Sequence, residues 1–210
     1  FAGILPDGSR KKICLPMAPE YIGYADLGLI ADMFVSTKPQ IELLDGGRFK
    51  YHIDFDTLQI GKDIGAVCIS RPTNPTGNVV TDAELARLIE LTAQRHIPLI
   101  VDSAYGLPFP AMVYVGAEPV WNENLILCFS LSKLGLPSLR TGIVIAQKEI
   151  IKALTAMNAI MSLTPTSFGA VLARNLFKNQ EITTLSRKII QPFYRAKMEK
   201  AVAVVRDTFT

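Results

Sequence analysis

Short continuous apolar runs recur along the chain, at 66–70, 97–101 and 125–129. Runs of this kind are typical of strands that are covered on both faces. Stretches with a helical period lie between and after them, so that predicted strands and helices alternate. This order predicts an α/β fold with a mostly parallel, doubly wound sheet flanked by helices.

The clearest helix signal begins at Thr81. Thr81 and Glu84 have the spacing of a capping box, and the helix that they open is expected to reach about Arg95. Leu85 and Leu88 recur on one face of it, as a helix packed on a core requires. The pattern further predicts a strand at 141–146 and helices at 147–161, 167–178 and 186–208, with a break at 164–166 around Pro165.

The first third of the chain has a weaker pattern. It predicts a strand at 12–17, a short amphipathic helix with glycine interruptions at 22–34, and a strand at 40–44. Residues 51–60 are predicted to form a linking segment or a short helix.

Composition narrows the class of protein. The 210 residues are 49% hydrophobic and 20% charged, which is enough to bury the core of one α/β domain. The net charge of +3 is small and scattered, so a nucleic-acid partner is not expected. No apolar run approaches the ~18 residues of a membrane span, so no membrane partner is expected either.

The three cysteines, Cys14, Cys68 and Cys128, each lie inside an apolar run. An odd number of apparently buried cysteines, without the spacing of metal ligands, is typical of reduced core thiols. We therefore predict a cytoplasmic protein without a metal site.

Polar segments follow three of the predicted strands, at 74–77, at 102–105 and at 130–133, with Arg140 seven residues after the last. In open α/β sheets ligands bind outside the carboxyl ends of the strands. The three segments are therefore expected to converge on one rim of the sheet. There they would offer an amine, a carboxylate, a phenol, an amide, hydroxyls and a guanidinium, the groups that fit pyridoxal 5′-phosphate.

Each group matches one requirement of that cofactor. Lys133 is the candidate for the Schiff base and for moving the substrate's alpha proton, and Asp102 for the partner of the pyridine nitrogen. Asn74 and Tyr105 can donate to the ring oxygen. The predicted catalytic residues are thus Lys133, Asp102 and Tyr105. Ser130, Ser132 and Arg140 supply two hydroxyls and a planar fork suited to phosphate.

Taken singly, each of these residues has a simpler interpretation. A lysine or arginine is most often a solvated surface charge, an aspartate after an apolar run is often a turn or a helix cap, and Asn-Pro-x-Gly is often a turn. The order and spacing of all the segments together favour the cofactor site.

The segments 71–78, 104–110, 130–137 and 18–26 resemble the class I and II aminotransferases of pyridoxal-phosphate fold type I, over essentially the whole chain. The longer phrases are most similar to the valine–pyruvate branch of that family. The resemblance implies the same roles for Lys133, Asp102 and the phosphate-binding residues. It also implies that Tyr21 stacks on the cofactor ring, although a core or rim tyrosine is an equal alternative.

The resemblance further implies that residues 1–210 are the cofactor-binding large domain, without an N-terminal segment and a C-terminal small domain. It implies a homodimer and an amino acid and a keto acid as substrates, with L-valine and pyruvate first among them. Two other hypotheses remain open: another fold type I enzyme, such as a carbon–sulfur lyase or an aromatic aminotransferase, and a sensor domain that binds the cofactor without catalysis.

Overall fold

The computed structural model describes residues 1, 3–28, 30–164 and 166–209. Its centre is a six-stranded sheet in the order β2-β1-β5-β6-β7-β8, in which only β7 and β8 pair antiparallel. The predicted mostly parallel α/β sheet is therefore confirmed. The strands are β1 (Lys12–Leu15), β2 (Phe34–Ser36), β5 (Ile64–Ser70), β6 (Leu99–Asp102), β7 (Leu125–Ser130) and β8 (Gly142–Ile145).

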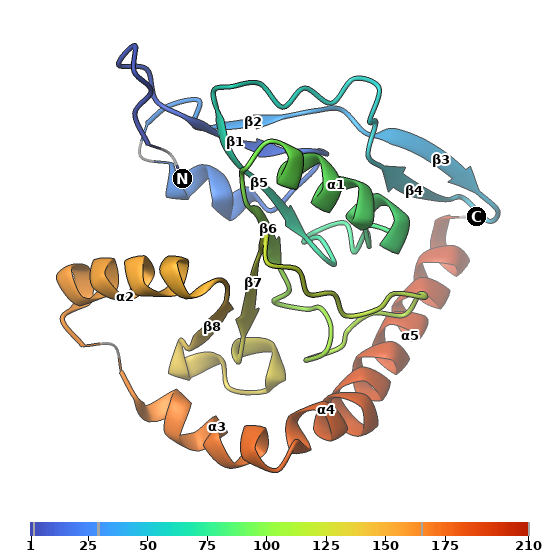
Figure 1. Ribbon diagram of the computed structural model, residues 1–210. Coiled ribbons are helices and arrows are strands. Elements are labelled where there is room, and N and C mark those ends of the chain that lie inside the picture. Colours follow the sequence, from blue (N-terminus) through green and yellow to red (C-terminus); the bar gives the residue numbers. More distant parts are fainter. Residues whose placement is uncertain (2, 29, 165, 210) are drawn as a thin grey trace.

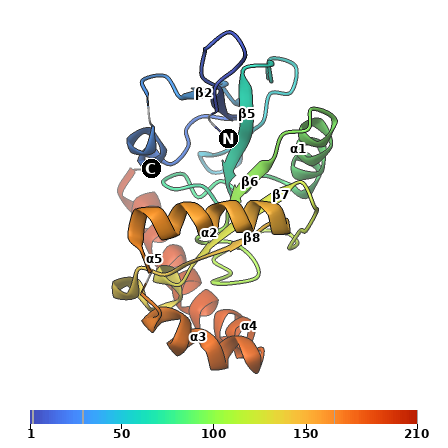
Figure 2. The ribbon, with the colours of Figure 1, turned by 60° about the vertical axis from the view of Figure 1, so that its left-hand side comes forward.

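Helices flank this sheet. Helix α1 lies against it, and α2 to α5 follow one another in an arc around the β7–β8 side of the molecule (Figures 1 and 2). The α-helices are α1 (Asp82–Gln94), α2 (Lys148–Ser162), α3 (Phe168–Lys178), α4 (Glu181–Leu185) and α5 (Gln191–Phe209), with a π-helical turn at Ser186–Ile190. Short 3-10 helices span Ile22–Leu27, Ser132–Leu134 and Pro137–Leu139.

The core is centred on β5, every residue of which is buried. Leu99 and Leu125 on the neighbouring strands are fully buried, and Leu85 and Leu88 of α1 pack into the same cluster. The continuous apolar runs of the sequence are thus the strands with neighbours on both edges, as their composition predicts.

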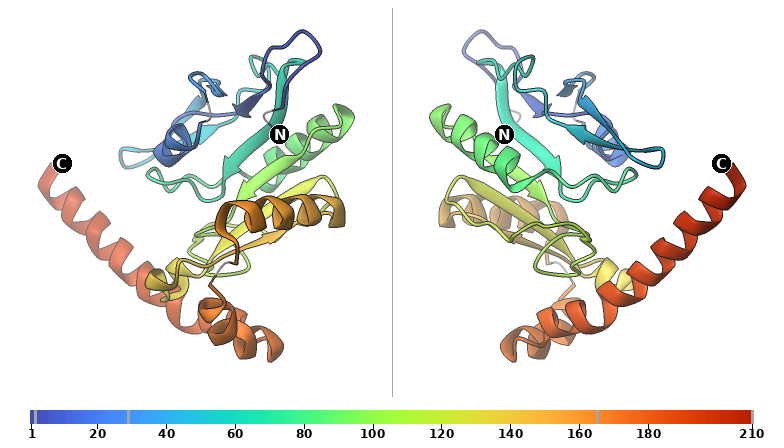
Figure 3. Two further views of the ribbon diagram at one scale, coloured as in Figure 1. Left: turned by 90° about the vertical axis from the view of Figure 1, so that its left-hand side faces the viewer. Right: turned by 90° about the vertical axis from the view of Figure 1, so that its right-hand side faces the viewer.

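A separate antiparallel hairpin is formed by β3 (Gln40–Leu44) and β4 (Arg48–His52). Its turn contains Gly46 and Gly47, both with a φ of 70° that favours glycine. The carboxylate of Glu84 joins this hairpin to α1: it accepts from the amide of Ile53 at 2.9 Å and lies 3.1 Å from His52 Nδ1, while completing the capping box with Thr81. The C-terminal end of α5 lies near the β3–β4 hairpin (Figures 1 and 3). Arg206 in its last turn lines one surface hollow together with Asp45 of the hairpin turn.

Two local predictions need correction. The helix predicted at 22–34 is a 3-10 helix that ends at Leu27, after which the chain leads into β2; Leu29 lies outside the described residues. Tyr51 and His52 belong to β4 rather than to a linking segment or a helix. Pro165 also lies outside the described residues, but α2 ends at Ser162 and α3 begins at Phe168, on either side of the predicted break.

Candidate active site

The carboxyl ends of β5, β6 and β7 bring polar residues from three chain segments to one rim of the sheet. The strand register pairs Ser70 with Asp102 and Asp102 with Cys128, so the strand ends lie side by side. A cavity of about 260 Å³ opens there, and all eight residues predicted for the cofactor site line it. These residues are Tyr21, Asn74, Asp102, Tyr105, Ser130, Ser132, Lys133 and Arg140.

Asp102, the last residue of β6, presents a half-buried carboxylate to this cavity. Its Oδ1 accepts from the amide of Ala104 at 2.9 Å, and its Oδ2 accepts from the hydroxyl of Tyr24 at 3.1 Å. Hydrogen bonds to the charged form of a carboxylate favour that form. Two donors therefore hold Asp102 in place as an acceptor.

Lys133 lies in the 3-10 turn Ser132–Leu134 that follows β7. The turn is fixed by its apolar neighbours, because Leu131 is fully buried and Leu134 is 5% exposed. Between them the half-buried Lys133 side chain lines the cavity, with its Nζ 5.0 Å from the ring centre of Tyr105. This is the range of a cation–π contact for the charged amine.

Hydroxyls and a guanidinium gather beside Lys133. Arg140 Nη1 donates to Ser132 Oγ at 3.3 Å, and the amide of Ser132 donates to Ser130 Oγ at 3.1 Å. Arg140 has a φ of 45° and ends the 3-10 turn Pro137–Leu139, so the chain returns to the cavity after a short excursion. This cluster has the donors that a phosphate dianion requires.

Asn74 and Tyr105 line the cavity from the loops that follow β5 and β6, and Tyr21, 40% exposed, lies at its edge. Taken together, the cavity offers a carboxylate, an amine, an amide, phenols and an anion-binding cluster. The residues present therefore fit pyridoxal phosphate, which has a ring nitrogen, an aldehyde, a ring oxygen and a phosphate to be held.

The sequence analysis did not single out three further residues of this region, Tyr24, Ser70 and Glu20. The Tyr24 hydroxyl lies 2.7 Å from Ser70 Oγ, and Glu20 accepts from the amides of Ser70 at 2.9 Å and Tyr21 at 2.8 Å. Burial raises the pKa of the Glu20 carboxyl above its ordinary value. The partners are 46 to 50 residues apart in sequence, so no local motif marks them.

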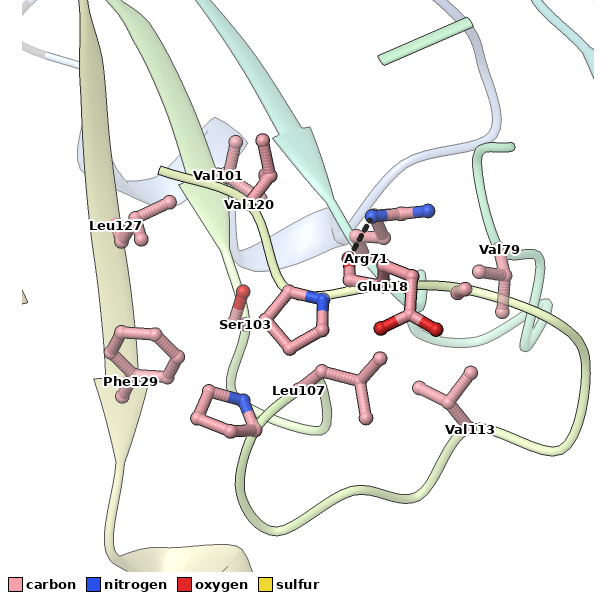
Figure 4. Close-up of a pocket in the computed structure, with 13 residues that line it drawn as sticks. Arg71, Val79, Val101, Ser103, Leu107, Val113, Glu118, Val120, Leu127 and Phe129 are labelled. Atoms are coloured by element: carbon pink, nitrogen blue, oxygen red, sulfur yellow. Dashed lines mark hydrogen bonds between the residues drawn. The ribbon is translucent and has the colours of Figure 1, made fainter. Parts of the chain in front are cut away.

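A second, smaller cavity of about 40 Å³ lies behind the rim, between β6, β7 and the loop that follows β6 (Figure 4). Val101, Leu127 and Phe129 give it an apolar wall, and its size leaves room for a few waters at most. Arg71 at its edge donates to the carbonyl of Glu118 at 3.2 Å (Figure 4). It also donates to the carbonyl of Val80 at 2.7 Å. The residues around this cavity support the loops of the candidate active site, and we assign the cavity itself no catalytic role.

Arg71 also pairs with Asp82 at the start of α1. This hydrogen bond lowers the pKa of the Asp82 carboxyl below its ordinary value. The arginine thereby joins the loop after β5, the first turn of α1 and the loop around residue 118. These contacts fix the backbone on which Asn74 and Tyr105 are carried.

Within the described ranges, no three or more histidine, cysteine or acidic side chains group together as metal ligands would. Nor does the described part of the chain contain a helix with the length and apolar character needed to cross a membrane. Of the three cysteines, Cys14 and Cys68 are buried, whereas Cys128 is half-buried.

Residues 34–203 match the sequence profile of the family described as aminotransferase class I and II. The match covers most of the chain. The chain belongs to the class I and II aminotransferases.

Individual proteins and solved structures show which members of the family this chain is similar to. The valine–pyruvate aminotransferase of Escherichia coli (strain K12) is 52% identical over 206 residues, which are 98% of this chain and 49% of that protein. The crystal structure of valine–pyruvate aminotransferase from Salmonella typhimurium LT2 has a TM-score of 0.88 and 50% identity, covering 94% of this chain and 50% of that one. A putative amino-acid aminotransferase from Psychrobacter arcticum 273-4 has a TM-score of 0.90 and 47% identity, covering 94% and 47%. The chain spans about half the length of the curated relatives it matches.

Proposed function

We propose that this chain is the cofactor-binding part of a pyridoxal-phosphate-dependent aminotransferase for small aliphatic amino acids. The proposed reaction converts L-valine and pyruvate to 3-methyl-2-oxobutanoate and L-alanine. The observation that carries the proposal is that Lys133, Asp102 and the Ser130–Ser132–Arg140 cluster line one cavity at the rim of the sheet. The choice of substrates rests on the relative from Escherichia coli named valine–pyruvate aminotransferase.

When bound, pyridoxal phosphate supplies an aldehyde that exchanges amino groups and a ring that withdraws electrons from the substrate. Lys133 would hold the cofactor through its amine and would serve as the general base that takes up and returns the alpha proton. The turn between two buried leucines keeps the backbone of Lys133 in place at the cavity.

Asp102 would accept a hydrogen bond from the protonated ring nitrogen. Its two donors, the Ala104 amide and the Tyr24 hydroxyl, hold the carboxylate in position. Asn74 and Tyr105 would donate to the ring oxygen, Tyr21 would contact the ring, and Ser130, Ser132 and Arg140 would bind the phosphate. These roles assign each of the eight predicted residues to one part of the cofactor.

The proposal extends to the assembly and the place of the protein. Residues 1–210 are the large domain, the active protein is a homodimer, and it acts in the cytoplasm. The exposed apolar side chains of α2, α3 and α5 support a larger assembly, because such surfaces are usually covered in a functional protein. Burial of the cysteine thiols supports a reducing compartment.

The test is an absorbance spectrum of the protein, at its full natural length, with pyridoxal phosphate before and after addition of L-valine. A band of bound cofactor that L-valine, but not D-valine, converts with release of 3-methyl-2-oxobutanoate is the expected result. A band that L-valine leaves unchanged would point to another fold type I reaction, such as a carbon–sulfur lyase or an aromatic aminotransferase, or to a sensor. Absence of any band from the folded protein would exclude the cofactor.

A further inference from the structure

In the proposed function Tyr24 only holds Asp102 in place, but its hydrogen bond to that carboxylate also affects the charge at the centre of the site. Tyr24 Oη lies 3.1 Å from Asp102 Oδ2 and 2.7 Å from Ser70 Oγ. The side chain is 8% exposed and comes from the 3-10 helix Ile22–Leu27, far from both partners in sequence. A buried hydroxyl with two polar partners is a defined part of the site rather than an incidental contact.

The number of protons fixes the direction of these hydrogen bonds. A phenol has one proton to donate, and an ionised carboxylate can only accept. Tyr24 therefore donates to Asp102, and Ser70 donates to Tyr24. Since the other Asp102 oxygen accepts from the Ala104 amide at 2.9 Å, each oxygen of the carboxylate has a donor from a different segment.

The surroundings hold Tyr24 in this position. Its ring stacks on Phe34 at a centroid distance of 6.0 Å and meets the edge of Tyr21 at 5.5 Å. Glu20 fixes the backbone on either side of the hydroxyl by accepting from the amides of Ser70 and Tyr21. The ring contacts do not involve the hydroxyl, so a phenylalanine at position 24 can keep them.

Tyr24 keeps its proton across the neutral pH range, so it remains a hydrogen-bond donor to Asp102. Burial above all, together with the nearby charge of Asp102, raises the pKa of the Tyr24 phenol well above its ordinary value. Burial also raises the pKa of Cys68 to about 12 and of Cys128 to about 11, so that both thiols are uncharged at neutral pH. The other ionisable neighbours are Glu20, whose carboxyl pKa burial also raises, and the residues that share the cavity with Asp102, namely Tyr21, Tyr105, Lys133 and Arg140.

We propose that Tyr24 is a positioning residue that, through its hydrogen bond to Asp102, sets the strength of the negative charge acting on the bound pyridoxal phosphate. The inference rests on the proposed function. Without the hydrogen bond from Tyr24, the negative charge of the Asp102 carboxylate is less neutralised. It then stabilises nearby cationic groups more strongly. Groups that titrate on the bound cofactor then lose their proton at a higher pH.

The experiment compares Tyr24→Phe with the parent, both at full natural length and loaded with pyridoxal phosphate. The absorbance of the bound cofactor is titrated against pH over the range in which the protein stays folded. We expect the midpoint of the variant to rise by about half a pH unit or more, because one donor to a charged acceptor is lost. Thermal unfolding of the cofactor-free protein should change little, since the ring contacts remain.

Two variants serve as controls. Tyr51→Phe removes a hydroxyl from β4, away from the cavity, and should leave the midpoint unchanged. Ser70→Ala removes the donor to Tyr24 while leaving the Tyr24–Asp102 bond, and should raise the midpoint by less. If Tyr24→Phe does not fold, a rise in Ser70→Ala supports the inference and no rise overturns it.

The failures of the two proposals can be told apart. A parent protein that shows no band of bound cofactor overturns the proposed function and the inference with it. A parent that binds the cofactor, together with a Tyr24→Phe midpoint that is unchanged or lower, overturns the inference alone.

Discussion

The central strands and the C-terminal helices are built from similar apolar residues but bury them to opposite extents. Every residue of β5 is buried, and Leu125 at the start of β7 is 0% exposed. No residue of α2 is buried, and its Ile160 and Met161 are 84% and 82% exposed. Apolar side chains of the same types are thus covered by neighbours in β5 and left exposed in α2.

The difference explains where chemistry is possible in this chain. A central strand has partners on both edges and helices on its faces, so the side chains at its end are held by a packed core. On the C-terminal helices, charged residues of the same types stand in solvent. Pairs of identical substitutions, one in each region, test whether position alone creates the site.

The largest effect is expected from Lys133→Ala. Because Lys133 is the proposed attachment point, this variant should lose all covalent binding of pyridoxal phosphate. The measurement is mass spectrometry after borohydride reduction of the loaded protein. Lys152→Ala, which changes an exposed lysine of α2, is the matched control and should label fully. Covalent labelling of the Lys133→Ala protein would show that Lys133 is not the attachment point of the cofactor.

The second largest effect is expected from Leu125→Ala. Removal of a fully buried leucine side chain leaves a cavity and should lower the free energy of unfolding by about 2–5 kcal/mol. Urea denaturation followed by circular dichroism measures this change. A loss well below 1 kcal/mol would contradict the description of β7 as a core strand.

A smaller effect is expected from Arg140→Ala. Loss of a charged hydrogen bond to the phosphate should weaken binding of pyridoxal phosphate by about 1.5–3 kcal/mol. Equilibrium dialysis against the cofactor gives the dissociation constant. The control, Arg174→Ala, changes an exposed arginine of α3 and should leave it unchanged. Equal affinities for both variants would place Arg140 outside the phosphate site.

The smallest effect is expected from Ile160→Ala. Since this side chain is 84% exposed, its removal from the 210-residue chain should change the free energy of unfolding by no more than about 0.5 kcal/mol. The same denaturation experiment applies as for Leu125→Ala. A loss as large as that of Leu125→Ala would mean that α2 packs on another surface, and the comparison between the two regions would fail.

Much of the fold could be predicted because the informative signals are local. The runs that became β5, β6 and β7 are continuous and apolar, and Thr81 and Glu84 mark the start of α1 within four residues. Strands β2 and β4 were missed for opposite reasons. The first is only three residues long, and the second alternates charged and aromatic residues and so contains no continuous apolar run.

The residues of the candidate site also divide into those that local sequence patterns indicate and those that they do not. Seven of the eight predicted residues lie in short segments at or after the ends of β5, β6 and β7, and their order and spacing pointed to them; Tyr21 came from the family resemblance alone. Tyr24, Ser70 and Glu20 could not be named, because their hydrogen bonds join segments that are 46 to 78 residues apart. Sequence patterns thus indicated most of the polar groups around the cavity but not the hydrogen-bond network that holds Asp102.

The contacts of Glu84 predict which parts of the molecule unfold together when the structure opens locally. Two-stranded hairpins are marginally stable on their own in water. The single carboxylate that caps α1 also accepts from the Ile53 amide directly after β4. The hairpin and the first turn of the helix should therefore show a common free energy of opening in amide hydrogen exchange, as one cooperative unit, although they are about 30 residues apart along the chain.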